Sequence, residues 1–294
     1  MTIRSAPSES PLSGRVVLIS GAARGLGQSH VELLLQLGAA VAAADVDGDA
    51  LEQLAGAAPS SALLTLHGDV SSESGATAMV ERSIDRFGRL DAVVNNAGFL
   101  RDASLPKMTL DRWREVTTVH LDGAYLLTRA AWPHLRQSGS GRVVFTTSHA
   151  GLVGNHGQSN YAAAKMGLVG LANVLAIEGA RYGIGVNVVA PLAHTRLSDG
   201  VWPEGILERL DPRFVSILVA RLCSSECGET GVVIGAGGGL YVRHAICDVG
   251  EARFARPPSW EELGDAWADL CIPPSNGTGV GTVRRMLEGE PGSG

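Results

Sequence analysis

Short apolar runs alternate with segments of helical periodicity along most of this 294-residue chain. Runs of residues buried on both faces of a sheet read as continuous Val- and Ala-rich stretches, and strands separated by helices pair in parallel. The alternation therefore predicts an α/β fold with one doubly wound, seven-stranded parallel sheet. The seven predicted strands fall within residues 15–21, 40–45, 62–70, 90–98, 141–148, 183–191 and 231–238.

One large domain is expected, because 294 residues with 45% hydrophobic content suit a single well-buried core. The stretch 109–137 is expected to be helical. Residues 246–271 are expected to form a short helical extension in which Ser259 caps a helix and Glu262 completes a capping box. Residues 1–11 and 272–294 are rich in Ser, Pro and Gly and are expected to be disordered tails.

The charge pattern favours a small-molecule partner. The formal net charge is −6 and no cluster of Lys and Arg is present, which disfavours nucleic acid and anionic membranes as main partners. The first residues lack the apolar core of a secretory signal, and no apolar run of about 18 residues marks a membrane span. We expect a cytoplasmic protein whose four cysteines are reduced thiols and bind no metal.

A glycine-rich turn joins the first predicted strand to the first helix in the segment ISGAARGLGQSH. Gly21, Gly25 and Gly27 permit close backbone approach, and a helix N-terminus attracts a pyrophosphate. Asp45 ends the second strand, where an acid accepts hydrogen bonds from an adenosine ribose and repels a 2′-phosphate. Arg24 would favour that phosphate, or would be a solvated surface charge. The weight of Asp45 predicts NAD rather than NADP.

Two further strand ends carry candidate cofactor contacts. Asp69 and Val70 follow the third strand and would reach adenine, although Asp69 would equally serve as the cap of the next helix. Asn95 to Gly98 follow the fourth strand, where a cofactor lies at the carboxyl ends of the strands, although polar residues there also form ordinary turns. The predicted cofactor contacts near these turns are Gly21, Arg24, Gly25, Leu26, Gly27, Asp45, Asp69, Val70, Asn95, Ala97 and Gly98.

Tyr161 and Lys165 lie four residues apart in an Ala-rich segment, so their side chains share one helical face. A free Tyr has a pKa near 10, and a neighbouring ammonium lowers it by favouring the phenolate. The pair would therefore act as a general acid and base, and Ser148 after the fifth strand would hold the same substrate oxygen. Taken alone, a Tyr and a Lys at this spacing more often form an ordinary amphipathic surface.

In this order and spacing the motifs resemble the short-chain dehydrogenase/reductase family over residues 12–245. The resemblance implies an NAD-binding domain of the Rossmann type. It also implies that Tyr161 is the general acid/base, that Lys165 lowers its pKa and binds the nicotinamide ribose, and that Ser148 contacts the reacting oxygen. His120 stands where many members have an Asn that acts in a proton relay through its backbone carbonyl. The usual Pro-Gly is Pro191 followed by Leu, and Thr195 is the candidate contact of the carboxamide.

Several segments between residues 90 and 271 are similar to the (3R)-hydroxyacyl-CoA dehydrogenase unit of peroxisomal multifunctional enzyme type 2. The favoured substrate is therefore a (3R)-3-hydroxyacyl-CoA. The alternatives are a steroid, terpenoid or polyketide carbonyl and, from another class, a non-catalytic NAD-binding regulator. The resemblance implies a homodimer or homotetramer formed through the helices of 109–137 and 160–180. His194 and Arg196 would contact an anionic part of the substrate, or would be charges at a helix terminus. Trp202 would lie in a lid over the substrate, or would simply pack as a lone Trp.

Overall fold

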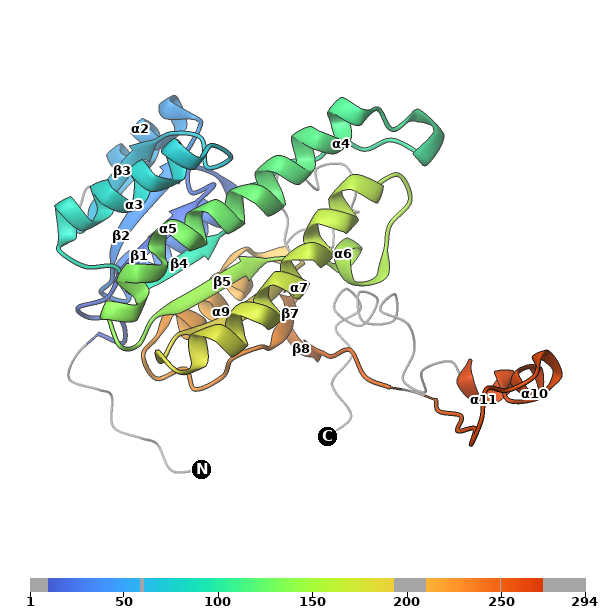
Figure 1. Ribbon diagram of the computed structural model, residues 1–294. Helices are drawn as coiled ribbons and strands as arrows, with labels where there is room; N and C mark the ends of the chain where they lie inside the picture. Colours follow the sequence, from blue (N-terminus) through green and yellow to red (C-terminus); the bar gives the residue numbers. More distant parts are fainter. Residues whose placement is uncertain (1–9, 59–60, 193–209, 249, 272–294) are drawn as a thin grey trace.

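An eight-stranded sheet forms the centre of the protein (Figure 1). The computed structural model describes residues 10–58, 61–192, 210–248 and 250–271. The strand order is β3-β2-β1-β4-β5-β6-β7-β8. β2 and β3 therefore lie on one side of β1, and β4 and all later strands lie on its other side. The strands are β1 (Val16–Ser20), β2 (Ala40–Asp45), β3 (Leu63–His67), β4 (Ala92–Asn95), β5 (Arg142–Thr146), β6 (Gly185–Pro191), β7 (Val233–Gly237) and β8 (Leu240–His244).

The expected parallel α/β sheet is confirmed, but the predicted count of seven strands is one too low. β8 pairs antiparallel with β7 through a register from Val233 with His244 to Gly237 with Leu240. Gly238 and Gly239 have φ of +58° and +80°, a conformation that glycine adopts without strain, and they turn the chain back on itself. β8 is half exposed, so it lacks the continuous apolar run by which the other strands were predicted.

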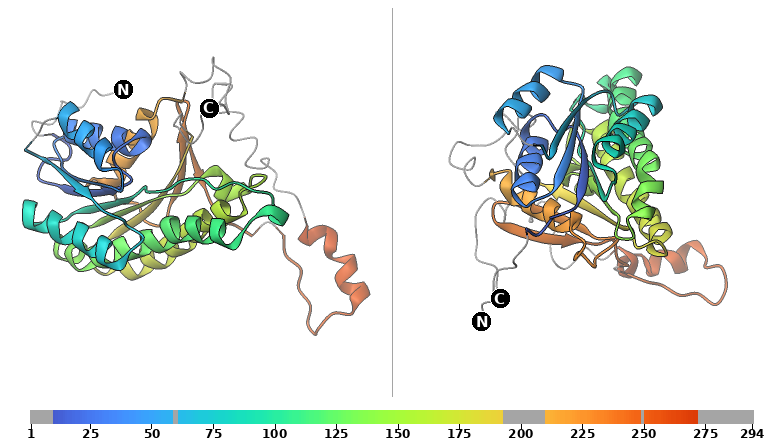
Figure 2. Two further views of the ribbon diagram at one scale, coloured as in Figure 1. Left: turned by 90° about the horizontal axis from the view of Figure 1, so that it is seen from above. Right: turned by 90° about the vertical axis from the view of Figure 1, so that its left-hand side faces the viewer.

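Helices cover both faces of the sheet (Figure 2). Alternate strand residues point to opposite faces: Val16 and Leu18 belong to one hydrophobic core, and Val17 and Ile19 belong to the other. The first core includes residues of α3, α5 and α7, and the second includes residues of α1, α2 and α9. These helices are α1 (Gly25–Gln36), α2 (Gly48–Ala57), α3 (Glu73–Phe87), α5 (Gly123–Gln137), α7 (Ser159–Ala180) and α9 (Arg213–Cys223).

The stretch expected as one helix over 109–137 contains an irregularity. α4 (Leu110–Thr117) is followed by a π-helical segment, η2 (Thr118–Asp122), before α5 begins at Gly123. A π-helical turn inserts a residue into the helical repeat and is frequent at functional sites. Side-chain periodicity alone does not reveal such an insertion.

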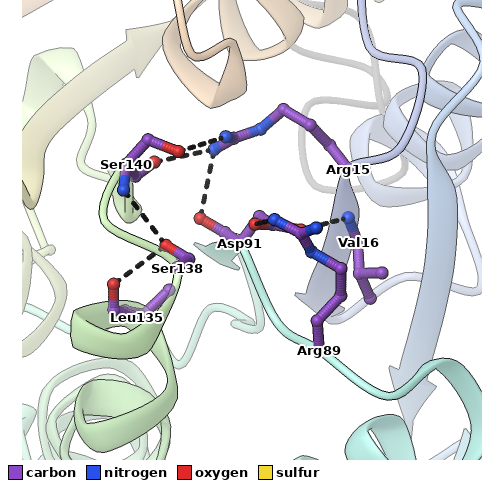
Figure 3. A network of polar contacts seen from close by, with 7 residues as sticks. All are labelled: Arg15, Val16, Arg89, Asp91, Leu135, Ser138 and Ser140. Atoms are coloured by element: carbon purple, nitrogen blue, oxygen red, sulfur yellow. Dashed lines mark hydrogen bonds and ion pairs between the residues drawn. The ribbon is translucent and has the colours of Figure 1, made fainter.

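The amino ends of the strands are joined by a polar network around Asp91 (Figure 3). Asp91 is fully buried, and its Oδ2 accepts hydrogen bonds from the Val16 backbone and from Arg89 Nε, both at 2.9 Å. Arg15 donates to the carbonyl of Asp91 and to Ser140. The buried carboxylate therefore has charged and backbone donors around it, as burial of a charge requires.

α7 is, within the described part of the chain, the one helix whose length and composition would suit a membrane span. It packs against β5, β6 and α6 (His149–Val153), and one of its faces, which includes Leu168 and Val169, belongs to the core of the domain. The two predicted catalytic side chains on it also face the domain. The remaining short elements are η1 (Leu105–Lys107), α10 (Trp260–Asp265) and α11 (Trp267–Leu270).

The extension beyond β8 carries α10 and α11, which lie away from the sheet (Figure 1). The predicted capping box is confirmed: Ser259 accepts from the backbone of Glu262, and Glu262 accepts from the backbone of Ser259. Residues 1–9 and 272–294, most of the two predicted tails, lie outside the described residues.

Candidate active site

A cavity of about 740 Å³ lies at the carboxyl ends of the central strands. It extends from the glycine turn and the end of β2 to the predicted catalytic helix. Its lining residues are Ser20, Gly21, Arg24, Gly25, Leu26, Gln28, Ala44, Asp45, Val46, Asp47, Gly68, Asp69, Val70, Met79, Asn96, Ala97, Gly98, Phe99, Val119, His120, Thr146, Thr147, Tyr161, Lys165 and Pro191.

The glycine turn requires glycine for reasons visible in the structure. Gly21 has φ of +65°, and a Cβ on it would lie 2.6 Å from the Cα of Ala97. A Cβ on Gly27 would overlap the carbonyl oxygen of Gly21. Gly27 therefore lets α1 pack closely under the turn and does not line the cavity. The first turn of α1 faces the cavity through Gly25 and Leu26, which leaves backbone N–H groups and the positive end of the helix dipole for an anion.

Asp45 ends β2 and lines the cavity next to the glycine turn. Its Oδ2 accepts from the backbone N of Ala23 at 2.9 Å, and its Oδ1 accepts from the backbone N of Asp47 at 3.0 Å. The carboxylate thus fixes the glycine turn relative to the end of β2. It remains only partly buried and lines the cavity, so it is accessible to a ligand.

Asp69 is not the cap of α3. The capping residue is Ser72, which accepts from the backbone of Gly75 at 3.0 Å. Asp69 instead accepts from the backbone and the hydroxyl of Ser71, and it lines the cavity together with Val70. The interpretation of Asp69 as a helix cap is therefore wrong.

The segment after β4 separates into two structural roles. Asn95 does not line the cavity, since its side chain is buried and donates to the hydroxyl of Thr128 on α5 at 2.9 Å. Asn96 lines the cavity and donates to the carbonyl of Gly21 at 2.9 Å. Ser20, which the sequence interpretation missed, accepts from the backbone of Asn96 and of Ala97. Its signal is a polar residue ending an otherwise apolar strand.

Tyr161 faces the cavity from the first turn of α7. Burial raises the pKa of its phenol, a hydrogen bond with Ser148 acts in the opposite direction, and the charge of Asp102 raises the pKa further. That Lys165 lowers this pKa stays a prediction. Ser148 also caps α6, where its hydroxyl accepts from the backbone of Ala150 at 3.2 Å. Ser148 does not line the cavity itself but contacts Tyr161.

Lys165 is buried with its amine directed at the same cavity. Its Nζ donates to the carbonyl oxygen of Thr146 at 2.6 Å and lies 5.6 Å from the centroid of the Tyr161 ring. Burial lowers the pKa of Lys165 to about 7. Thr146 also lines the cavity, and its buried hydroxyl has no hydrogen-bond partner among the described residues, which leaves it for a ligand.

His120 belongs to the π-helical segment η2, and its ring contacts the ring of Tyr161. The two rings meet edge to face with centroids 5.2 Å apart, and His120 Nε2 lies 2.9 Å from the nitrogen and 2.8 Å from the oxygen of Phe99. Burial and the charge of Lys165 lower the pKa of His120 to about 3, so its imidazole is neutral. A Cβ on Gly98 would overlap this ring, which explains the glycine there.

Four candidates cannot be placed. Thr195, His194, Arg196 and Trp202 fall in residues 193–209, outside the described residues, while Pro191 lines the cavity. Besides Ser20, the cavity wall contains residues that the sequence interpretation did not single out: Gln28, Ala44, Val46, Asp47, Gly68, Met79, Phe99, Val119, Thr146 and Thr147. Most are apolar or small and carry no motif.

The cavity suits a dinucleotide cofactor by its residues. Its wall contains a glycine turn without room for side chains and an acid that contacts this turn. It also contains the Lys165 amine and the Thr146 hydroxyl, which has no partner in the part of the chain that the structure describes. Among the described residues, no group of three His, Cys, Asp or Glu side chains could hold a metal ion. The fold and the cavity together define a Rossmann-type protein with a site suited to a dinucleotide.

The chain belongs to the short-chain dehydrogenase family, whose model matches residues 15–199. It is 41% identical over 267 residues to a short-chain type dehydrogenase/reductase of Mycobacterium tuberculosis, covering 87% of this chain and 93% of the relative. It is 36% identical over 283 residues to peroxisomal multifunctional enzyme type 2 of Mus musculus. That match covers 89% of this chain but 37% of the mouse protein.

Solved structures agree with this assignment. A short chain dehydrogenase from Mycobacterium avium superimposes with a TM-score of 0.79 at 32% identity, covering 90% of this chain and 98% of the other. A 3-ketoacyl-(acyl-carrier-protein) reductase from Brucella melitensis, complexed with NADH, gives a TM-score of 0.72 at 28% identity, covering 77% of this chain and 98% of the other.

Proposed function

We propose that the chain is an NAD-dependent dehydrogenase that transfers hydride between nicotinamide and a secondary alcohol or ketone, with a (3R)-3-hydroxyacyl-CoA as favoured substrate. The observation that carries the chemistry is the placement of Tyr161 on the cavity wall, in contact with Ser148 and beside Lys165. Similarity to multifunctional enzyme type 2 supports the substrate class.

Each residue of the site has a separate role in the proposed reaction. Tyr161 takes the hydroxyl proton of the substrate in oxidation and returns it in reduction, and Ser148 holds the same oxygen by its hydroxyl. Lys165, with the Thr146 hydroxyl, would bind the ribose of the cofactor, and its ammonium form would stabilise the phenolate of Tyr161. The bound nicotinamide supplies the carbon that accepts or donates the hydride. His120, as a neutral imidazole, holds the Phe99 backbone and supports the Tyr161 ring.

The preference for NAD rests on Asp45. Its carboxylate faces the cavity beside the glycine turn, where it would accept hydrogen bonds from the adenosine ribose and repel a 2′-phosphate. The bound NADH of the Brucella reductase shows nicotinamide use by a structural relative. We expect a higher kcat/KM with NAD than with NADP, and the opposite ratio would contradict the cofactor assignment.

The central test replaces Tyr161 by Phe, which removes the hydroxyl and keeps the ring. Loss of a general acid/base lowers kcat by a factor on the order of 10²–10⁴. NADH formation is followed by absorbance with matched (3R)- and (3S)-3-hydroxyacyl-CoA substrates, and NADH affinity is measured by fluorescence. We expect turnover of the 3R form alone, its near loss in Tyr161→Phe, and unchanged NADH affinity.

The matched control is Tyr125→Phe, because Tyr125 is a half-exposed tyrosine on α5 that does not line the cavity. It should retain full turnover. Persistent activity of Tyr161→Phe would overturn the assignment of the acid/base. Absence of turnover of both substrates would redirect the search to steroid, terpenoid or polyketide alcohols. Tight NADH binding without turnover of any of these would favour a non-catalytic regulator.

A further inference from the structure

The guanidinium of Arg24 is held by a second acid, Asp47, at the same end of the cavity as Asp45. Both Nε and Nη2 of Arg24 donate to Asp47 Oδ2, at 2.9 and 2.6 Å. Both side chains line the cavity. An Arg beside a glycine turn has the charge and the donor geometry to bind a phosphate. The partner of Arg24 therefore affects which dinucleotide the cavity accepts.

Asp47 is fixed in place by contacts that do not involve Arg24. Its Oδ1 accepts from the backbone N of Ala50 at 3.0 Å as the cap of α2, and its own backbone N donates to Asp45 Oδ1 at 3.0 Å. The carboxylate is thus preorganised by the turn between β2 and α2. Because Arg24 reaches this carboxylate through a long flexible side chain, it is the member of the pair that would move to meet a phosphate.

We propose that Asp47 is a specificity-determining residue that withholds Arg24 from a 2′-phosphate and so adds to the preference for NAD over NADP. This inference rests on the proposed nicotinamide-dependent function. In this arrangement Asp45 repels the phosphate directly, and Asp47 occupies the cation that would otherwise attract it. From the sequence, Arg24 would favour a 2′-phosphate or would be a solvated surface charge, and the structure shows it paired with the carboxylate of Asp47.

The size of the effect follows from the exposure of the pair. Arg24 and Asp47 side chains are 40% and 37% exposed, so solvent and salt weaken their attraction. A phosphate can then compete for Arg24 once Asp47 loses its charge. We expect a change in NADP affinity of about threefold or more, and a smaller change at high salt.

The test uses Asp47→Ser, because Ser also caps helices and keeps α2 intact while removing the charge. Dissociation constants for NADP and NAD are measured by calorimetry for the wild type, Asp47→Ser, Arg24→Gln and the double variant. Asp49→Asn is the matched control, since Asp49 is an exposed acid in the first turn of the same helix. Thermal unfolding monitored by circular dichroism verifies that each variant folds.

Asp47→Ser should tighten NADP by about threefold or more and change NAD by less than about twofold. In the Arg24→Gln background the same substitution should have no effect on NADP, and Asp49→Asn should have none in either background. Equal tightening with and without Arg24, or no tightening at all, would overturn the inference. A wild type that prefers NADP would overturn the proposed cofactor instead, because the comparison between backgrounds measures the Arg24 and Asp47 coupling independently.

Discussion

At the scale of single residues, burial favours the neutral forms of Lys165 and Tyr161, whereas their spacing in the sequence suggests an ammonium beside a phenolate. Lys165 is 3% exposed and burial lowers its pKa, while burial raises the pKa of Tyr161. The spacing of the two residues was sufficient to predict that they share a face. It does not reveal the desolvation that shifts both groups towards their neutral forms, because burial depends on the packing of α7 against the sheet.

The titration of Lys165 can be measured directly, because the chain has two lysines, Lys107 and Lys165. Nζ signals of ¹⁵N-lysine-labelled protein are followed by NMR against pH. The Lys107→Arg variant removes the other lysine signal, so that the remaining one belongs to Lys165. We expect a midpoint near pH 7, because burial disfavours the ammonium. A midpoint near 10, the ordinary value for a lysine, would contradict the effect of burial on Lys165.

At the scale of secondary-structure elements, the sequence was most informative where one physical signal dominates. Apolar runs located β1 to β7, and the glycine turn was found because close packing around Gly21 and Gly27 excludes every larger residue. Prediction from apolar runs and helical periodicity failed for two elements. β8 is too exposed to form an apolar run, and η2 interrupts a helix without changing its composition. The sequence interpretation considered Asp69 as the cap of α3, and the structure shows that Ser72 is the cap.

The buried His30 at the contact between α1 and α9 makes the stability of the protein depend on pH. His30 Nδ1 lies 2.8 Å from Ser216 Oγ, and burial lowers the pKa of His30 to about 3. The unfolded chain therefore binds more protons than the folded chain between pH 6.5 and 3, so stability falls as the pH decreases through this window. The pKa of His120 is lowered in the same direction. Each histidine costs on the order of 2 kcal/mol at pH 5 relative to neutral pH.

His30→Gln removes one titrating group and retains a hydrogen-bonding side chain. Urea unfolding at pH 7 and pH 5 should show that the variant loses less stability than the wild type, by on the order of 2 kcal/mol. His156→Gln is the control, because His156 is exposed and its replacement should leave the difference between the two pH values unchanged. An equal loss in His30→Gln and the wild type would mean that His30 is accessible to protons in the folded state.

At the scale of the whole molecule, the two edges of the sheet have different roles. The carboxyl ends of the strands form the cavity, whereas the amino ends are fixed by the buried Asp91 and the arginines around it (Figure 3). Between these edges α7 contributes Tyr161 and Lys165 to the cavity with one face. Its opposite face exposes Val174 and Ile177, which are 51% and 79% accessible and lie three residues apart.

This exposed face of α7 predicts self-association. Val174 and Ile177 form an apolar strip along a helix whose other side is already packed, and pairing with a second copy of the chain would remove it from water. Ile177→Glu places a charge in that strip and should raise the dissociation constant of the oligomer by about tenfold or more. Size-exclusion chromatography with light scattering over a range of concentrations measures the change. Gln53→Glu adds the same charge to an exposed position of α2, on the opposite side of the sheet, and should leave the mass unchanged. If both variants have the mass of the wild type at every concentration, the copies associate through another surface or do not associate.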